Sequence, residues 1–263
     1  MGLTCQSCGK ALLKEKFNIK VGNPDELVIA LAGNPNVGKS TVFNALTGLK
    51  QHTGNWPGKT VTNARGNYKY KNKKFVLVDL PGTYSLLANS VEEEVARDFI
   101  CFGKPDATVV VTDATCLERN LNLVLQVMEL TNNVILCVNL MDEAKRKGIS
   151  LDLKALEKAL GIPVVGTSAR SGDGLIDLMN KIYDIGIGLE KSSPKKLVYP
   201  KELEVQIENL IPSLKEILGD QLNPRWVALK ILEGDPTILH SIQQFLHAES
   251  CFKKQKEGSR IYE

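Results

Sequence analysis

The 263-residue sequence lacks a long apolar run, a strong net charge and a large share of aromatic residues. No stretch reaches the ~18 consecutive apolar residues of a membrane-spanning helix, so we expect a soluble chain without a bilayer span or signal peptide. The formal net charge is only +3 and aromatic residues make up 6%, with no basic stripe and no stacking platform for bases. These absences argue against a nucleic-acid partner.

Paired metal-ligand motifs are also scarce. Cys5 and Cys8 form one C-x-x-C turn, but tetrahedral Zn²⁺ requires four ligands, and no second C-x-x-C or histidine pair follows. We favour a flexible tail over residues 1–24. The alternative is a site for an unidentified metal at Cys5 and Cys8, with further ligands from another chain. Cys101, Cys116 and Cys137 stand singly in apolar or helical runs and are expected to be packing residues in a reducing compartment.

A glycine-rich octapeptide is the strongest chemical signal that the sequence contains. It reads Gly33-Asn34-Pro35-Asn36-Val37-Gly38-Lys39-Ser40, which matches the phosphate-binding pattern G-x-x-x-x-G-K-[ST]. The apolar residues 27–32 before it predict a buried parallel strand, and the residues from Thr41 onward predict a helix. In this setting, backbone N–H groups and the helix N-terminus surround the phosphates. We expect Lys39 to reach the β- and γ-phosphates and the Ser40 hydroxyl to bind Mg²⁺.

A second strand end predicts which base is bound. Residues 134–138 are apolar and lead into Asn139-Leu140-Met141-Asp142. The carboxylate of Asp142 can accept both donors on the guanine edge, whereas adenine would leave it unpaired, so we expect GTP and GDP as ligands. We expect Asn139 to brace its loop and contact the purine. The backbone of Ser168-Ala169-Arg170, after the strand predicted at residues 163–167, is expected to close over the base.

Two segments between these motifs have the features of nucleotide-sensing loops. A strand over residues 74–78 leads into Asp79-Leu80-Pro81-Gly82, where Asp79 would meet Mg²⁺ through water and the Gly82 N–H would contact the γ-phosphate. The segment Gly54-Asn55-Trp56-Pro57-Gly58-Lys59-Thr60 is expected to be an exposed loop whose threonine completes the Mg²⁺ shell. Thr53 and Thr62 compete with Thr60 for this role, and spacing does not choose among them.

Five stretches beyond these general motifs make the chain resemble one family of GTPases. They are residues 33–36, 54–58, 79–86, 92–98 and 113–121. They are similar to the cytosolic N-terminal region of the FeoB ferrous-iron transporters, in which a G protein is fused to a polytopic membrane domain. The resemblance implies that Thr60 is the switch threonine. It also implies that Asn36 holds K⁺ together with the backbone carbonyls of Gly54 and Trp56.

The resemblance extends to biological context. It implies regulation of ferrous-iron uptake by nucleotide state, at the cytoplasmic face of the bacterial inner membrane. The implied partners are the chain's own membrane-spanning domain, small cytosolic accessory proteins of iron transport, and further copies in a homo-oligomer. Two residues depart from the family pattern, because Lys59 and Thr62 stand where Val and Glu are usual. The switch surface of this chain is therefore expected to differ.

The residues around the phosphates also predict how the reaction runs. Thr83 follows Gly82 at the position where Ras-like proteins carry the glutamine that orients water. We expect slow intrinsic hydrolysis unless the switch backbone or a cation positions the water, and K⁺ at Asn36 could replace an arginine finger. The residues expected to act directly in hydrolysis are Asn36, Lys39, Thr60 and Gly82. Leu140 replaces the lysine of N-K-x-D loops, which predicts looser nucleotide binding and faster GDP release.

The pattern of elements predicts an α/β fold followed by helices. Residues 25–190 alternate strands and helices, as in the Ras-like, doubly wound, mostly parallel sheet of P-loop GTPases. Residues 191–263 begin with a polar linker and contain only helical signals, which predicts a small bundle connecting to an absent membrane domain. Pro212 predicts a kink or a break in the first of these helices. Asn223-Pro224 and Asp235-Pro236 predict helix starts, and Ser90 with Glu93 predicts a capping box.

Two alternative functions are compatible with the nucleotide motifs. One is a stand-alone Era-like GTPase in RNA assembly, but the C-terminal part offers no G-x-x-G clamp and no basic stripe for RNA. The other is a GTP-binding scaffold without turnover. Phosphate release measured in K⁺ and Na⁺ buffers would separate that scaffold from the regulatory GTPase.

Overall fold

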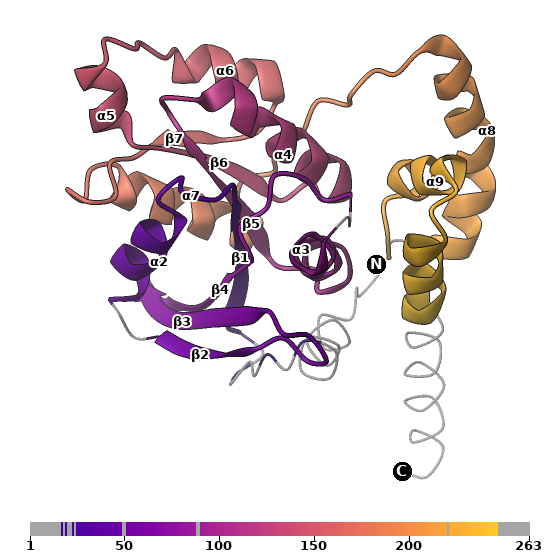
Figure 1. Cartoon of the computed structure of the whole chain (residues 1–263), viewed down its shortest axis with the longest axis horizontal. Helices are drawn as coiled ribbons and strands as arrows, with labels where there is room; N and C mark the ends of the chain where they lie inside the picture. Colours follow the sequence, from indigo (N-terminus) through magenta and orange to yellow (C-terminus); the bar gives the residue numbers. More distant parts are fainter. Residues whose placement is uncertain are drawn as a thin grey trace. The chain divides into compact units, whose positions relative to one another are not determined.

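The computed structural model describes residues 17, 19, 23, 25–48, 51–87, 90–219 and 221–246. The chain divides into two compact units, with the boundary between Lys196 and Leu197. Among the described residues, the unit that ends at Lys196 contains a β-sheet with helices, and the unit that begins at Leu197 contains helices only (Figure 1). The predicted C-x-x-C pair, Cys5 and Cys8, lies outside the described residues.

A seven-stranded sheet forms the centre of the α/β unit. Its strands are β1 (Leu27–Gly33), β2 (Gln51–Asn55), β3 (Thr62–Tyr70), β4 (Lys73–Asp79), β5 (Ala107–Asp113), β6 (Val134–Asn139) and β7 (Val164–Gly166). They lie in the order β2-β3-β4-β1-β5-β6-β7, and β4, β1, β5, β6 and β7 run parallel. β2 and β3 pair antiparallel at one end, and β3 turns into β4 through Lys71 and Asn72 to form an antiparallel hairpin.

Helices alternate with the parallel strands. They are α2 (Lys39–Thr47), α3 (Val91–Phe102), α4 (Leu117–Leu130), α5 (Met141–Arg146), α6 (Leu153–Leu160) and α7 (Leu175–Gly186). The predicted class, an α/β fold with a mostly parallel sheet followed by helices, is confirmed. Carboxyl ends of parallel strands meet at one edge, so the loops after β1, β4, β6 and β7 gather there. This edge positions the site.

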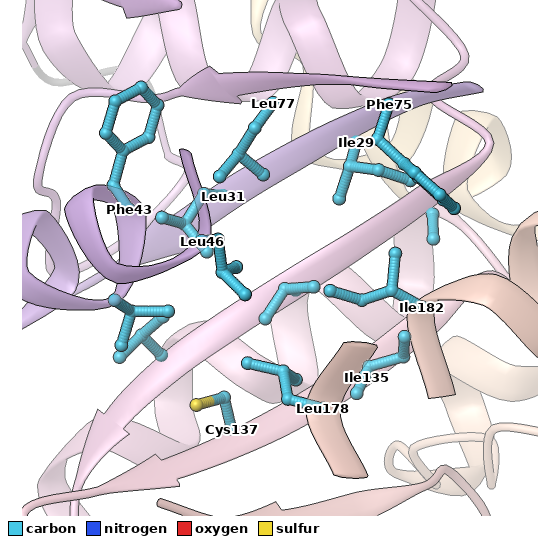
Figure 2. Close-up of a cluster of buried hydrophobic side chains, with 14 of the residues drawn as sticks. Ile29, Leu31, Phe43, Leu46, Phe75, Leu77, Ile135, Cys137, Leu178 and Ile182 are labelled. Carbon is cyan, nitrogen blue, oxygen red and sulfur yellow. The ribbon is translucent and has the colours of Figure 1, made fainter. Parts of the chain in front are cut away.

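The core lies on both faces of the sheet because helices cover the central strands on each face. Side chains of α2 and α7 pack against alternate residues of β1 and its neighbours, as Figure 2 shows. The labelled members are Ile29, Leu31, Phe43, Leu46, Phe75, Leu77, Ile135, Cys137, Leu178 and Ile182. Val28 and Ala30 point to the opposite face and are equally buried. All of β1 is therefore buried, which holds the loop that follows it in place.

The helical unit contains α8 (Lys201–Leu218), α9 (Pro224–Glu233) and a further helical stretch from residue 236 to 246. Asn223 caps α9 by accepting from the Arg225 N–H, and Asp235 Oδ1 accepts from the Thr237 N–H, as both Asx-Pro pairs predict. The predicted break at Pro212 does not occur, since α8 continues through it. A proline removes one helical hydrogen bond, but buried side chains along α8 hold it on both sides of that position.

Two other predictions are corrected. The segment 54–60 is not an exposed loop throughout, because Gly54 and Asn55 belong to β2 and the Trp56 side chain is only 2% exposed. Trp56 packs against other aromatic rings, which local sequence does not reveal. Cys116 is exposed at the start of α4, whereas Cys101 and Cys137 are buried packing residues.

The Ser90 part of the capping box is confirmed, since Ser90 Oγ accepts from the Glu93 N–H at 3.2 Å.

Candidate nucleotide-binding site

The glycine-rich loop connects the buried strand β1 to the N-terminus of α2, as predicted. Gly38 has a φ of 80°, and a Cβ there would collide with the side-chain amide of Asn139. A Cβ at Gly33 would lie 2.6 Å from the Val111 carbonyl oxygen. Only glycine fits at these two positions, so the loop can pass close to its neighbours. Its backbone then curves around the start of α2, where unpaired N–H groups favour an anion.

Lys39 and Asp79 meet at this edge although 40 residues separate them. The Lys39 ammonium forms an ion pair with Asp79 Oδ1 and donates to the Leu80 carbonyl oxygen at 2.7 Å. Burial raises the pKa of the Asp79 carboxyl, and the charge of Lys39 opposes that shift only in part. The phosphate-loop lysine and the carboxylate expected at Mg²⁺ thus occupy one partly buried cluster.

Asn139, at the end of β6, connects its own loop to the phosphate loop and to the segment after β7. Its Nδ2 donates to the Val37 carbonyl at 3.0 Å, and its Oδ1 accepts from Thr167 Oγ1 and from the Ala169 N–H at 3.1 Å each. The side chain is 1% exposed, so these bonds are made away from solvent. The bracing expected of Asn139 is therefore visible in the geometry, whereas its contact with a purine stays a prediction.

The base-reading loop is held by backbone contacts. The Asp142 N–H donates to Ser168 Oγ at 3.1 Å, and the Met141 N–H donates to the Thr167 carbonyl at 3.1 Å. Leu140 has a φ of 62°, which starts α5 with a sharp turn. The Asp142 side chain is exposed at the beginning of this helix. The backbone of Asp142 is therefore joined to Ser168, whereas a base site shared by Asp142, Ser168 and Ala169 stays a prediction.

The three competing threonines differ in their surroundings. Thr53 pairs with Ala64 and Thr62 with Asn55 in the β2–β3 ladder, whereas Thr60 lies in the connection between these strands. Thr60 is exposed there. A residue outside the ladder can move without breaking strand pairing, which favours Thr60 as the switch threonine.

The structure does not assemble every predicted ligand. Asn36 is exposed with a φ of 65°, and among the described residues no hydrogen bond joins it to Gly54 or Trp56. The Trp56 carbonyl accepts from the Lys59 N–H at 3.0 Å. Gly82 does approach the phosphate loop, since a Cβ on it would lie 3.5 Å from Pro35 Cα. The loop after β4 is therefore next to the glycine-rich loop, and among the described residues no hydrogen bond joins Asn36 to the loop after β2.

Comparison with known proteins identifies the family. A family profile described as "Ferrous iron transport protein B" matches residues 27–182. A second, the FeoB cytosolic helical domain, matches residues 199–261. This chain belongs to the FeoB family. Its α/β unit is the G domain of that family, a GTPase-type domain. Helices α8 and α9 lie in the region that the helical-domain profile matches.

Solved FeoB structures agree with this fold. The cytosolic domain of T. maritima FeoB in its apo form is 40% identical, with a TM-score of 0.75, and the match covers 84% of this chain and 86% of that one. The GMPPNP form of the same protein is 40% identical, with a TM-score of 0.74 and coverage of 83% and 86%.

Curated FeoB relatives are longer than this chain. The Methanocaldococcus jannaschii Fe(2+) transporter FeoB is 46% identical over 215 residues, which are 79% of this chain and 30% of the relative. A Porphyromonas gingivalis fusion of Fe(2+) transport protein A with FeoB is 37% identical over 230 residues, 86% of this chain and 27% of the relative. The chain thus spans less than a third of the curated relatives it matches.

Some residues of the FeoB site were missed from sequence. Thr167 is 1% exposed and bonds both Asn139 and the Cys137 sulfur. Its place directly before Ser168, at the end of an apolar strand, was the available signal. Asn120 Oδ1 accepts from the Asp113 N–H at 2.7 Å and fixes the end of β5. Within the described ranges, no group of three or more His, Cys, Asp or Glu side chains could hold a metal ion, and no helix could cross a membrane.

Proposed function

We propose that this chain binds and hydrolyses GTP and that its nucleotide state regulates ferrous-iron uptake by a larger FeoB protein. The observation that carries this proposal is the convergence of Lys39, Asp79 and the Asn139-braced loops at one sheet edge. An ammonium, a carboxylate and a helix N-terminus are groups that phosphoryl transfer uses. A second carboxylate, that of Asp142, is suited to accept the two donors on the guanine edge. The GMPPNP form of the T. maritima domain supports nucleotide binding at this position.

The residues at the phosphate loop suit Mg²⁺. The Ser40 hydroxyl, at the start of α2, and the Asp79 carboxylate are oxygen donors, which this hard cation prefers. Thr60 would join them when its loop closes. Bound Mg²⁺ neutralises charge on the phosphates during transfer. Lys39 would exchange its contact with Asp79 for phosphate oxygens, which frees that carboxylate for the metal shell, and the Gly82 N–H would donate to the γ-phosphate.

A K⁺ site is the part of the proposal that depends on movement. The exposed amide of Asn36 lies in the phosphate loop, and the carbonyls of Gly54 and Trp56 would complete the site once the end of β2 and its connection to β3 shift together. Bound K⁺ supplies positive charge beside the phosphates. Asn36 would position that charge in the way that an arginine finger does in other GTPases.

The transport role rests on the relatives. They are named as Fe(2+) transporters and extend well beyond the matched region, so we propose that the chain's own membrane domain is its principal partner and the inner membrane its location. The P. gingivalis relative is fused to Fe(2+) transport protein A, which favours a small accessory protein as a second partner. A homo-oligomer is proposed from the family resemblance alone. Iron is the cargo, and no iron ligand is assigned here.

Phosphate release separates this function from a scaffold without turnover. We expect GTP hydrolysis with Mg²⁺ to be faster in K⁺ than in Na⁺ by about 10²–10³-fold, the usual size of preorganised charge stabilisation. Asn36→Ala should remove the difference between the two cations while GTP remains preferred over ATP. Equal rates in K⁺ and Na⁺ for the unchanged chain would refute the potassium role, and no hydrolysis in either buffer would refute the GTPase.

A further inference from the structure

A segment that precedes the family match packs into the α/β unit. The profile of the G domain begins at residue 27, yet Phe17 and Ile19 are buried, with 5% and 0% exposure. Both belong to the same compact unit as the sheet. The N-terminal extension therefore contributes side chains to the G domain rather than only preceding it.

Phe17 contacts the first residue of the switch connection. Its ring centroid lies 6.0 Å from that of Trp56 at an interplanar angle of 90°, and 5.2 Å from that of Phe99 at 80°. Trp56 and Phe99 also meet, at 5.5 Å and 61°. Three rings from the extension, the connection after β2 and helix α3 thus form one edge-to-face cluster, a geometry that the aromatic quadrupole favours.

The burial of Trp56 depends on these rings. Its indole N–H is buried and has no hydrogen-bond partner among the described residues, so the buried position is not secured by a polar contact. The backbone of Trp56 is held, since its N–H donates to Val61 and its carbonyl accepts from Lys59. Residues 57–60 therefore form a turn that begins at Trp56 and ends at Val61. Because Trp56 is the first residue of this turn, movement of its ring is expected to move the turn.

The same turn has a second link to α3. Lys59 forms an ion pair with Glu94 at 2.8 Å, and both side chains are about one-third exposed, at 34% and 36%. A pair this accessible is screened by solvent and releases readily. The buried ring cluster is the lasting attachment, and the Lys59–Glu94 pair is the one that can open when Thr60 moves.

We propose that Phe17 is a positioning residue for GTP hydrolysis, acting through Trp56. This inference rests on the proposed GTPase function. By holding the Trp56 ring against α3, Phe17 anchors one end of the connection and limits the directions in which the connection can move. Thr60 then searches a smaller space before it reaches the metal shell. Loss of the Phe17 ring leaves the nucleotide pocket intact but loosens the element that must close on GTP.

The test compares Phe17→Ala with Phe17→Leu in the full 263-residue chain. Phe17→Ala should lower kcat for GTP in K⁺ by about 2- to 10-fold, the range expected for losing edge-to-face ring pairs. KM and GDP affinity should change less than twofold, about 0.4 kcal/mol at the tenfold-per-1.4 kcal/mol conversion. Phe17→Leu, which keeps an apolar side chain but no ring, should give a kcat between those of the parent and of Phe17→Ala. Tyr70→Ala is the matched control, because it removes an edge-to-face pair with Tyr183 in the same unit, at 6.4 Å.

Tryptophan fluorescence gives a readout that a general loss of stability would not mimic. The chain has two tryptophans, so Trp226→Phe leaves Trp56 as the single emitter. In that background, Phe17→Ala should raise the acrylamide quenching constant of Trp56, because the ring that shields the indole is gone, and Tyr70→Ala should leave it unchanged. Binding of a non-hydrolysable GTP analogue should change Trp56 emission more in Phe17→Ala than in the parent, because the ring is no longer held.

Each outcome decides the proposal. An unchanged or raised kcat in Phe17→Ala overturns it, as does equal Trp56 quenching in the parent and the variant. If Phe17→Ala does not fold, Phe17→Leu carries the test, and unchanged kcat and unchanged Trp56 shielding in that variant overturn the proposal. If the parent itself releases no phosphate, the GTPase function fails separately. The analogue-induced change in Trp56 emission then decides whether Phe17 positions the connection.

Discussion

Replacing Asn139 with alanine tests the structural basis of the whole site. The substitution removes the three hydrogen bonds that join the phosphate loop, the strand end of β7 and the loop at Ala169. The Thr167 hydroxyl keeps its contact with the Cys137 sulfur at 3.3 Å, but the Val37 carbonyl and the Ala169 N–H lose the Asn139 side chain. Each buried polar group left unpaired costs about 1–3 kcal/mol, so we expect Asn139→Ala to lower the free energy of unfolding by about 2–6 kcal/mol.

The loss should be larger for nucleotide binding than for the fold elsewhere. Asn139 aligns the phosphate loop with the base loops, so its removal should weaken GDP binding more than tenfold, which is at least ~1.4 kcal/mol. Urea unfolding followed by tryptophan fluorescence measures the first effect, and calorimetric titration of GDP measures the second. Because the chain has two compact units, the unfolding of the α/β unit should be followed separately, with Trp56 as the sole tryptophan.

Asn180→Ala is the matched control for this experiment. Asn180 also makes a side-chain hydrogen bond within the α/β unit, accepting from the Tyr70 hydroxyl at 2.7 Å, and this bond joins α7 to the end of β3 rather than to the phosphate loop. Its replacement should cost about 0.5–1.5 kcal/mol and leave GDP affinity unchanged. If Asn139→Ala behaves like Asn180→Ala in both measurements, the bracing role is refuted.

Two further predictions concern the ligands themselves. Asp142→Ala should abolish the preference for GTP over ATP, because two charge-assisted hydrogen bonds worth about 1.5–3 kcal/mol each disappear. Competition binding of GTP and ATP measures this preference. Equal affinities for the two nucleotides in the unchanged chain would contradict the guanine assignment. Ser40→Ala should weaken Mg²⁺-dependent binding of GDP and GTP alike, whereas Thr60→Ala should impair hydrolysis and spare GDP affinity. Normal hydrolysis in Thr60→Ala combined with its loss in Thr62→Ala would show that Thr62 is the switch threonine.

Local patterns were sufficient for the elements that frame the site. The apolar run before Gly33 predicted strand β1, and the residues from Thr41 onward predicted helix α2, with the glycine-rich loop between them. The same reasoning located β6 before Asn139 and the caps at Ser90 and Asn223. These features depend on residues within a few positions of each other, so periodicity, glycine and capping chemistry are visible in the chain itself.

Contacts between distant segments were not visible in this way. The sequence indicated that Trp56 would be in an exposed loop, because glycine, proline and lysine surround it. Its ring is buried instead by Phe99, 43 positions later, and by Phe17, 39 positions earlier, as the ring contacts show (99 − 56 and 56 − 17). Cys116 was expected to be buried because it borders an apolar helix, but it starts α4 on the exposed side.

The order and spacing of neighbouring residues are enough to predict the strand–loop–helix around the phosphate loop and the α/β class, and to propose a base-reading role for residues 139–142. Only the folded chain shows that Lys39 meets Asp79, that Asn139 joins the phosphate loop to the segment after β7, and that Phe17 reaches Trp56. These meetings depend on which strands become neighbours in the sheet and on how the side chains between them fill space. Such pairings are set by packing across the whole unit, and no local pattern records them.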